Sequence, residues 1–323
     1  MPEIGKRILL VVASTVVFIL LCIAGYEIYG NIRYRQWRSE FDGSGKFQRL
    51  TIPSPDRILM WEYKPYGEYG KIRTNRFGFR EHDSISTEVP GDAYRIAFIG
   101  DSITLGMEVD LDDTFVKILE REAPKTGSGK SIQTLNFGID GYSAIQIHEL
   151  LSYKVLDFSP DEVFYVMCLN DFDFTESSGG KTRYFAKPKS FLLERIDKLR
   201  QKLSNTDFHM YHFSRNRLSV YQRIAQMNGL LKRNNSRLTL VIVPVFNLTE
   251  SGFSDYSLGG MHLDIATFAL EEGIDVIDLL KAFASQDKPP ASFATDIWHL
   301  NENGHRFVAQ QLLSNVSFVG ESR

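Results

Sequence analysis

The stretch Arg95–Ser102, RIAFIGDS, carries the clearest structural signal in this 323-residue chain. Its apolar run IAFI has no polar residue at alternate positions, which is typical of a strand buried on both faces. The turn GDS follows at once and ends at Ser102, and a helix-like segment lies further on at 113–122. A buried strand followed by a Gly-containing turn and a helix is the unit from which parallel sheets are built.

Outward from this stretch, apolar runs alternate with amphipathic segments as far as the C-terminal region. The strand-like runs are Arg95–Ile99, Thr134–Phe137, Val163–Leu169, Leu238–Val245 and Val276–Leu279. The helix-like segments are Asp113–Glu122, Ala144–Leu156, Ser219–Lys232, Asp264–Glu272 and Gly304–Leu313. This alternation predicts an α/β fold with a doubly wound parallel sheet between two layers of helices. In such sheets, reactive groups gather beyond the carboxyl ends of the strands, where the strand order reverses.

The charge balance limits the range of partners. The chain has 37 Lys and Arg residues against 40 Asp and Glu residues, a formal net charge of -3 and a pI near 6.2. Nucleic-acid binding requires clustered Lys and Arg side chains that neutralise phosphates, so we expect no nucleic-acid partner.

The cysteine and histidine patterns argue against disulfides and metal sites. Cys22 lies in an apolar N-terminal run and Cys168 in a strand-like run far along the chain, so we expect neither a disulfide nor a cysteine-based metal set. His209 and His212 have a spacing that suits a metal on one helix face, but no third ligand lies nearby. We therefore expect no metal and no cofactor. The histidines interpreted as structural or surface groups are His82, His148, His209, His212, His262 and His305.

An uncharged run, Ile8–Tyr26, follows Lys6 and Arg7 at the N-terminus. It has about the ~20 residues that a helix needs to cross a bilayer. It is longer than the ~7–15 apolar residues of a cleaved signal peptide, which favours a retained single-pass anchor, with cleavage after Ala24 as an alternative. A buried core helix is another alternative, but it would leave Lys6 and Arg7 unexplained.

These features predict three parts of the chain. They are a membrane anchor over residues 1–30, a strand- and turn-rich connecting segment over 31–92, and an α/β domain over 93–323. Basic residues flank the apolar run on both sides, so the positive-inside rule does not decide the orientation. A short basic tail directly before the run resembles a signal-anchor, and we therefore expect a single-pass membrane protein with its α/β domain outside the cytoplasm.

Ser102 is the candidate nucleophile. A serine hydroxyl needs an imidazole to remove its proton, and the imidazole needs an acid that holds its tautomer. Asp296 and His299 are three residues apart near the end of the chain, a spacing that allows the carboxylate to reach the ring. Without that pair, Ser102 would be interpreted as a turn or helix-cap serine. We interpret Asp101 and Asp171 as residues that hold their loops through hydrogen bonds to backbone N–H groups.

The reaction also requires donors for an oxyanion, each of which contributes ~3–4 kcal/mol to the transition state. Gly141 follows the second predicted strand and can bring its backbone N–H close to a ligand because it has no Cβ. Asn170 follows the third strand and offers a side-chain amide, although a turn residue remains the alternative. With the N–H of Ser102, the predicted oxyanion hole has three donors.

From Tyr94 to Leu313, the chain resembles the SGNH, or GDSL-type, hydrolase family, in its membrane-anchored bacterial type. The resemblance implies a flavodoxin-like fold, with Ser102 as nucleophile, His299 as general base and Asp296 as its orienting acid. It also implies Gly141 and Asn170 as oxyanion donors. Two positions depart from the family pattern, namely Ile103 in place of Leu and Cys168 in place of Gly. The four blocks in order are Gly100-Asp101-Ser102, Gly141, Asn170-Asp171 and Asp296 with His299.

The predicted reaction is hydrolysis of an acyl ester through an acyl-enzyme on Ser102, with O-acetyl groups on a carbohydrate as one candidate substrate. The expected partners are therefore an acyl-ester small molecule or an acylated glycan, and the membrane through the N-terminal helix. One alternative is an O-acyltransferase that passes the acyl group to a glycan. The other is a catalytically silent, membrane-anchored binding protein that keeps the fold.

Several further segments are predicted to lie around the active-site pocket. Residues 172–174, 177–181 and 247–260 are predicted to cover or wall the pocket, and Trp298 to line it. The segment 73–80, RTNRFGFR, is similar to one in membrane-anchored bacterial members of the family. Packing against the sheet edge and contact with substrate are its two interpretations.

Overall fold

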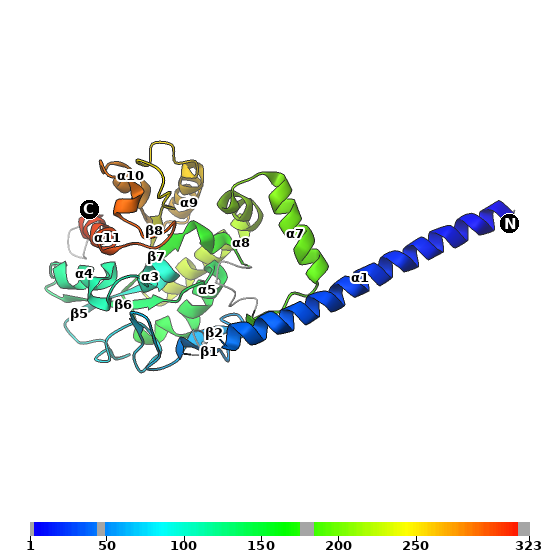
Figure 1. Ribbon diagram of the computed structural model, residues 1–323. Helices are drawn as coiled ribbons and strands as arrows, with labels where there is room; N and C mark the ends of the chain where they lie inside the picture. Colours follow the sequence, from blue (N-terminus) through cyan, green and yellow to red (C-terminus); the bar gives the residue numbers. More distant parts are fainter. Residues whose placement is uncertain (1–2, 44–48, 175–183, 316–323) are drawn as a thin grey trace. The chain divides into compact units, whose positions relative to one another are not determined.

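The chain folds into two compact units in the computed structural model (Figure 1). The smaller unit is helical and the larger one contains the sheet. The units comprise Met1–Gln48 with Ala186–Thr206, and Arg49–Phe185 with Asp207–Arg323. The structure describes residues 3–43, 49–174 and 184–315.

A five-stranded parallel sheet forms the centre of the larger unit, as predicted. Its strands are β5 (Ala93–Gly100), β6 (Ser131–Gly138), β7 (Glu162–Cys168), β8 (Arg237–Val243) and β9 (Asp275–Asp278). The spatial order is β6-β5-β7-β8-β9, and every neighbouring pair is parallel. The chain moves from β5 to one side and then returns to β7 on the other, so the strand order reverses between β5 and β7. This is the flavodoxin-like order, whose switch point is a common ligand site.

Helices follow the strands and cover both faces of the sheet. The helices of the larger unit are α3 (Ser102–Leu105), α4 (Phe115–Glu122), α5 (Ala144–Tyr153), α8 (Phe208–Arg233), α9 (Gly259–Glu271), α10 (Leu279–Ala284) and α11 (Glu302–Asn315). The five helices expected in the α/β part are confirmed, and α8 begins earlier than predicted. Short 3-10 turns are η1 (Leu111–Asp113), η2 (Val155–Phe158), η3 (Leu169–Phe172) and η4 (Pro290–Ser292).

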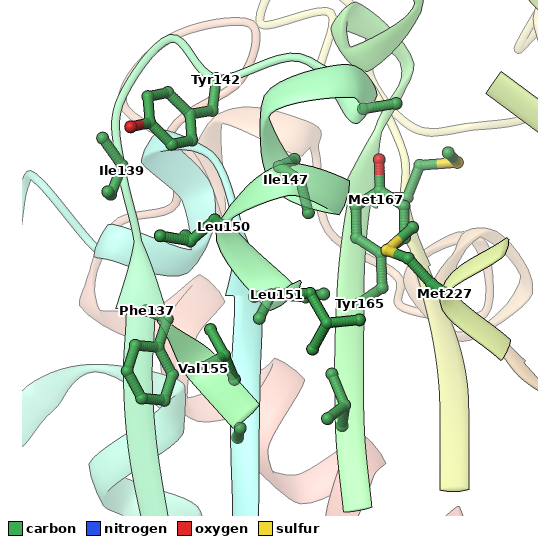
Figure 2. Close-up of a cluster of buried hydrophobic side chains, with 14 of the residues drawn as sticks. Phe137, Ile139, Tyr142, Ile147, Leu150, Leu151, Val155, Tyr165, Met167 and Met227 are labelled. Atoms are coloured by element: carbon green, nitrogen blue, oxygen red, sulfur yellow. The ribbon is translucent and has the colours of Figure 1, made fainter. Parts of the chain in front are cut away.

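The continuous apolar run in β5 is explained by a core on each side of the sheet. Ala97 and Ile99 belong to the cluster that α5, α8 and α9 cover, part of which Figure 2 shows around Leu150. Ile96 and Phe98 belong to the opposite cluster, under α4, α10 and α11. Because both strand faces are buried, polar alternation is absent from the sequence.

The connecting segment contains two small antiparallel ladders, β1 (Thr51–Pro53) with β2 (Trp61–Tyr63) and β3 (Glu68–Tyr69) with β4 (Ile72–Arg73). The expectation of strands and turns was wrong for its first residues, because helix α1 continues from Glu3 to Gly43. The sequence explains the continuation, since residues 31–42 contain neither Pro nor Gly and include the helix-favouring residues Arg, Gln and Glu.

The smaller unit is built from α1 and α7 (Phe191–Ser204). The portion Glu3–Glu40 of α1 is long and apolar enough to cross a membrane, with a mean hydropathy of 2.9 in its most apolar window. Helix α7 was not predicted, and its sequence shows charged residues at many positions.

Candidate active site

Ser102 is the first residue of α3, directly after β5 at the point where the strand order reverses. Asp101 caps this short helix, because its Oδ1 accepts a hydrogen bond of 2.9 Å from the backbone N–H of Ile103. The cap confirms the structural role predicted for Asp101. Ser102 is 8% exposed, so the fold leaves its hydroxyl a small accessible area.

Two glycines let α3 approach the strand ends closely. A Cβ on Gly138, at the end of β6, would lie 2.2 Å from the backbone nitrogen of Leu105. A Cβ on Gly100, at the end of β5, would lie 2.7 Å from the backbone oxygen of Val166. Any side chain at these positions would displace the turn that carries Ser102.

The structure brings Ser102, His299 and Asp296 together. His299 Nε2 lies 2.9 Å from Ser102 Oγ, and His299 Nδ1 lies 2.6 Å from Asp296 Oδ2. If Nδ1 carries the ring proton and donates it to the carboxylate, Nε2 is free to accept the serine proton. This arrangement allows an imidazole that a carboxylate orients to remove the proton of a serine hydroxyl.

The loop before α11 holds the acid in place through its own backbone. The N–H groups of Trp298 and His299 donate to Asp296 Oδ1 at 2.8 and 2.7 Å. Partial burial opposes ionisation of Asp296, but these hydrogen bonds and the imidazole outweigh it and lower the pKa of the carboxyl group. Asp296 is thus a carboxylate at neutral pH, as the tautomer of His299 requires.

Asn170 lies on η3 beyond β7, on the other side of the switch point from Ser102. Its Nδ2 donates to Asp101 Oδ2 at 3.1 Å, which leaves the second N–H of the amide for a ligand. The neighbouring Asp171 accepts from Tyr165 Oη at 2.8 Å and from the backbone N–H of Cys168 at 3.3 Å. Asp171 therefore holds this loop, as predicted.

The atypical Cys168 is fully buried at the end of β7. Burial raises the pKa of its thiol well above the usual range, and the nearby Asp101 and Asp171 add to this effect. The side chain is a buried, protonated thiol, in agreement with its interpretation as a small hydrophobic residue.

Gly141 follows β6, with a φ of 76°, in the left-handed region that favours glycine. Its loop is tied to β2 of the connecting segment. The backbone N–H of Asp140 donates to Tyr63 Oη at 3.0 Å, and that hydroxyl in turn donates to the Asp140 carboxylate. Tyr142 Oη donates to the carbonyl of Trp61. Sequence reasoning did not identify these contacts, since nothing local links residues so far apart.

The segment 73–80 packs against the turn that carries Ser102 through its last residue, Arg80. Arg80 is 1% exposed, and its guanidinium donates to the carbonyls of Leu105 at 2.8 Å, Val109 at 2.5 Å and also Gly106. Burial lowers the pKa of Arg80 to about 10, so the group stays charged at neutral pH. These contacts favour the packing interpretation of the segment, and they make Arg80 a support of the C-terminal end of α3.

A cavity of about 270 Å³ lies beside the acid end of the triad. Ile297, next to Asp296, lines it together with residues of the predicted wall 247–260. His209, interpreted as structural, is also in the lining and accepts a hydrogen bond of 3.4 Å from Trp298 Nε1. The cavity is lined by Asp207, His209, Val245, Phe246, Asn247, Glu250, Gly252, Phe253, Asp255, Tyr256, Ser257, Leu258, Pro290 and Ile297.

Two other predictions for the pocket have different outcomes. The prediction that Phe172 covers the pocket was wrong, because this side chain is fully buried in the core with its ring against Phe213. The predicted cover at 177–181 lies outside the described residues. Among the residues described, no group of three His, Cys, Asp or Glu side chains is arranged to hold a metal ion.

His305 is a structural histidine, as expected. It is fully buried, stacks on Phe115 and accepts a hydrogen bond of 3.2 Å from the backbone N–H of that residue. Burial lowers its pKa to about 3, and the nearby charge of Arg80 acts in the same direction. His305 is therefore neutral throughout the physiological range and takes no part in proton transfer.

Residues 98–307 match the model of the GDSL-like lipase/acylhydrolase family. The chain belongs to this family. This GDSL-like acylhydrolase is accordingly an enzyme that acts on ester bonds. The matched region contains Ser102, Gly141, Asn170, Asp296 and His299, all five predicted site residues.

Solved structures with a similar fold are esterases and hydrolases of low sequence identity. An acetyl xylan esterase, AlAXEase, is 19% identical, with 69% of this chain and 99% of that chain covered and a TM-score of 0.46. A catalytic mutant of an acetylxylan esterase from Geobacillus stearothermophilus is 18% identical, with coverages of 74% and 100% and a TM-score of 0.46. An alpha/beta hydrolase from the metagenome of Lake Arreo, Spain, is 18% identical, with coverages of 73% and 99% and a TM-score of 0.47. No curated protein matches this GDSL-like acylhydrolase in sequence.

Proposed function

We propose that this enzyme is a serine esterase that hydrolyses an acyl ester through an acyl-enzyme on Ser102. The observation that carries the proposal is the unbroken hydrogen-bonded chain from Ser102 through His299 to Asp296, with distances of 2.9 and 2.6 Å. A structural serine and a structural histidine would have no need of this alignment. The same series of hydrogen bonds argues against the alternative of a catalytically silent binding protein.

In the proposed reaction, His299 Nε2 takes the hydroxyl proton while Ser102 Oγ forms a bond to the ester carbonyl carbon. The carbonyl π electrons move to the oxygen and form the oxyanion. Its collapse breaks the bond to the alcohol oxygen, which receives the proton from His299. Water then attacks the acyl-enzyme by the same steps and releases the acid, while Asp296 stabilises the imidazolium in both halves.

The proposed oxyanion donors are the backbone N–H groups of Ser102 and Gly141 and the side chain of Asn170. The Ser102 N–H is at the N-terminus of α3, where backbone donors lack helical partners. Asn170 is held by Asp101, so its free N–H has a defined direction. Each such donor is expected to contribute ~3–4 kcal/mol to the transition state.

We propose an O-acetylated carbohydrate as the substrate class. The cavity beside Ile297 supports this choice, because it combines the rings of Phe253 and Tyr256 with acceptor side chains such as Glu250 and Asp255. Aromatic faces suit the apolar face of a sugar ring, and carboxylates accept hydrogen bonds from sugar hydroxyls. An acetyl group needs only a small acyl site next to Ser102.

The decisive test compares the wild type with Ser102→Ala and His299→Ala in fluorophosphonate labelling and in turnover of p-nitrophenyl acetate and acetylated xylo-oligosaccharides. We expect no labelling of Ser102→Ala and a loss of several orders of magnitude in turnover for both variants. Unchanged turnover in either folded variant would refute the assignment. If acylated glycan accumulates with little free acid, the reaction is acyl transfer and not hydrolysis.

A further inference from the structure

Four apolar residues of helix α7 form a stripe along its length, and Leu193, which is 66% exposed, lies to one side of it. Leu192, Ile196, Leu199 and Leu203 are spaced by four, three and four residues, so they lie on one face of the helix. The stripe opens toward solvent at its far end, where Leu199 is 42% and Leu203 is 81% exposed. Exposed leucines that lie together on one face of a helix indicate a surface that contacts an apolar partner.

Basic residues of α7 lie on both sides of this stripe. At 100° per residue, Arg195 and Lys202 flank it on one side and Arg200 on the other, while Asp197 lies on the opposite face. From Lys187 to Lys202 there are six Lys or Arg residues against two Asp or Glu residues, a net charge of +4. An apolar stripe flanked by basic residues is the pattern of a helix that lies in a membrane interface rich in anionic lipids.

Helix α7 begins on α1, through a cap that α1 supplies. The Glu27 carboxylate accepts hydrogen bonds from Ser190 Oγ at 2.6 Å and from the backbone N–H groups of Phe191 and Leu192 at 3.1 and 3.0 Å. A carboxylate at this position also interacts favourably with the helix dipole. Gly30 leaves the space that Phe191 occupies, since a Cβ there would lie 2.4 Å from the ring.

Helix α7 contacts α1 where the apolar run of α1 ends, which is the level expected for a membrane surface. The uncharged run Ile8–Tyr26 of α1, at 1.5 Å per residue, is about as long as the ~30 Å hydrocarbon core is thick. Glu27 is the first charged residue after this run, so the contact with α7 lies at the end of the apolar segment. Figure 1 shows that α7 then diverges from α1 rather than running along it.

We propose that α7 is a second membrane-contacting element that lies on the bilayer surface. Its stripe of Leu192, Ile196, Leu199 and Leu203 enters the boundary between headgroups and acyl chains, and its basic residues contact anionic headgroups. The partner is the lipid surface into which α1 inserts, because α7 starts where α1 leaves the apolar core. The proposal depends on α1 crossing the membrane and is independent of the chemistry at Ser102.

The test places a fluorescent label on each face of α7 in the full chain, reconstituted in vesicles of phosphatidylglycerol and phosphatidylcholine. Cys22 is first replaced by Ser, and the buried Cys168 stays unlabelled, which a variant without added cysteine verifies. Leu203→Cys reports the apolar stripe and Gln201→Cys the opposite face. Phe18→Cys reports the insertion of α1.

We expect lipids with a spin label on the acyl chain to quench the label at position 203 several-fold more than at 201, and to quench position 18 strongly. Replacing Arg195, Arg200 and Lys202 by Gln is expected to reduce quenching at 203 in anionic vesicles but not in neutral ones. Equal, weak quenching at 203 and 201 would overturn the proposal. Protection of position 203 that depends on protein concentration and not on lipid would also overturn it, in favour of a second copy of the chain.

Discussion

At the scale of single residues, the site depends on opposite electrostatic environments for its carboxylates. Asp296 is partly exposed and accepts two backbone hydrogen bonds and one from His299, and these interactions lower its pKa. Asp101 and Asp171 are fully buried, and burial raises the pKa of both. The ionised carboxylate can therefore orient the base, while the buried pair supports the loops that carry Ser102 and Asn170.

Asp296→Asn is expected to reduce kcat by about 10⁴-fold, because an amide N–H facing the ring would favour the wrong tautomer of His299. The fold should persist, since Asn keeps an acceptor for the backbone N–H groups of Trp298 and His299. Steady-state kinetics with thermal unfolding as the control measure both effects. Activity within tenfold of wild type, allowing about 1.4 kcal/mol of loss, would contradict the role of Asp296.

Asp171→Asn is expected to gain stability relative to wild type as the pH rises above the ordinary Asp pKa of 3.8. The pKa of Asp171 is raised in the folded state, so the native protein binds more protons than the unfolded chain in this range. The unfolding free energy of wild type therefore falls as the pH rises toward the folded-state pKa, and Asn removes this dependence. Urea unfolding across a pH series, with the exposed Asp287→Asn as control, measures the difference. If the difference in unfolding free energy between Asp171→Asn and wild type stays constant with pH, the pKa of Asp171 is not raised in the folded state.

At the scale of secondary-structure elements, helix α3, which carries Ser102, is held at both ends. Asp101 caps the N-terminus of α3, and the guanidinium of Arg80 satisfies the carbonyls at and after its C-terminus. Gly100 and Gly138 allow the strands to press against it. A helix of four residues has little intrinsic stability, so its position depends on these external contacts.

Arg80→Met is expected to lower the unfolding free energy by about 2–4 kcal/mol, because it removes the buried side-chain donor to the carbonyls of Leu105, Gly106 and Val109. We also expect kcat to fall more than KM changes, since α3 carries Ser102. Arg80→Lys should restore part of kcat, because one donor returns. The matched control is Arg73→Met, whose ion pair with Glu68 is exposed and should change stability by less than about 1 kcal/mol. Equal effects of the two Met variants would refute the role of Arg80.

At the scale of the whole molecule, the connecting segment is tied to the loop that carries Gly141. Tyr63 and Trp61 on β2 hold the loop of Gly141 through Asp140 and Tyr142. Residues of β2 therefore link a segment before the α/β domain to the loop of Gly141, the proposed oxyanion donor. The smaller unit combines the apolar helix α1 with the basic, amphipathic α7.

Tyr63→Phe tests the coupling between the connecting segment and the site. Loss of the hydroxyl removes one hydrogen bond to the Asp140 N–H and one to its carboxylate, and should cost about 1–2 kcal/mol of stability. We expect kcat for p-nitrophenyl acetate to decrease as the loop of Gly141 loosens. Tyr66→Phe, at an exposed ring, serves as control and should leave both quantities unchanged. Wild-type stability and kcat in Tyr63→Phe would show that the Tyr63 hydroxyl does not support the loop.

The sequence alone was sufficient for the five strands of the sheet, for five of the helices of the α/β part and for the grouping of Ser102 with Asp296 and His299, whereas the short helices α3 and α10 were not predicted. Buried parallel strands leave continuous apolar runs, and reactive groups follow them at the carboxyl ends, so local patterns carry this information. Tertiary structure decided the roles of Arg80 and Tyr63, the burial of Phe172 and the attachment of α7 to Glu27. Each of these depends on contacts between segments that are distant in the chain, and a distant contact leaves no periodic pattern in either segment.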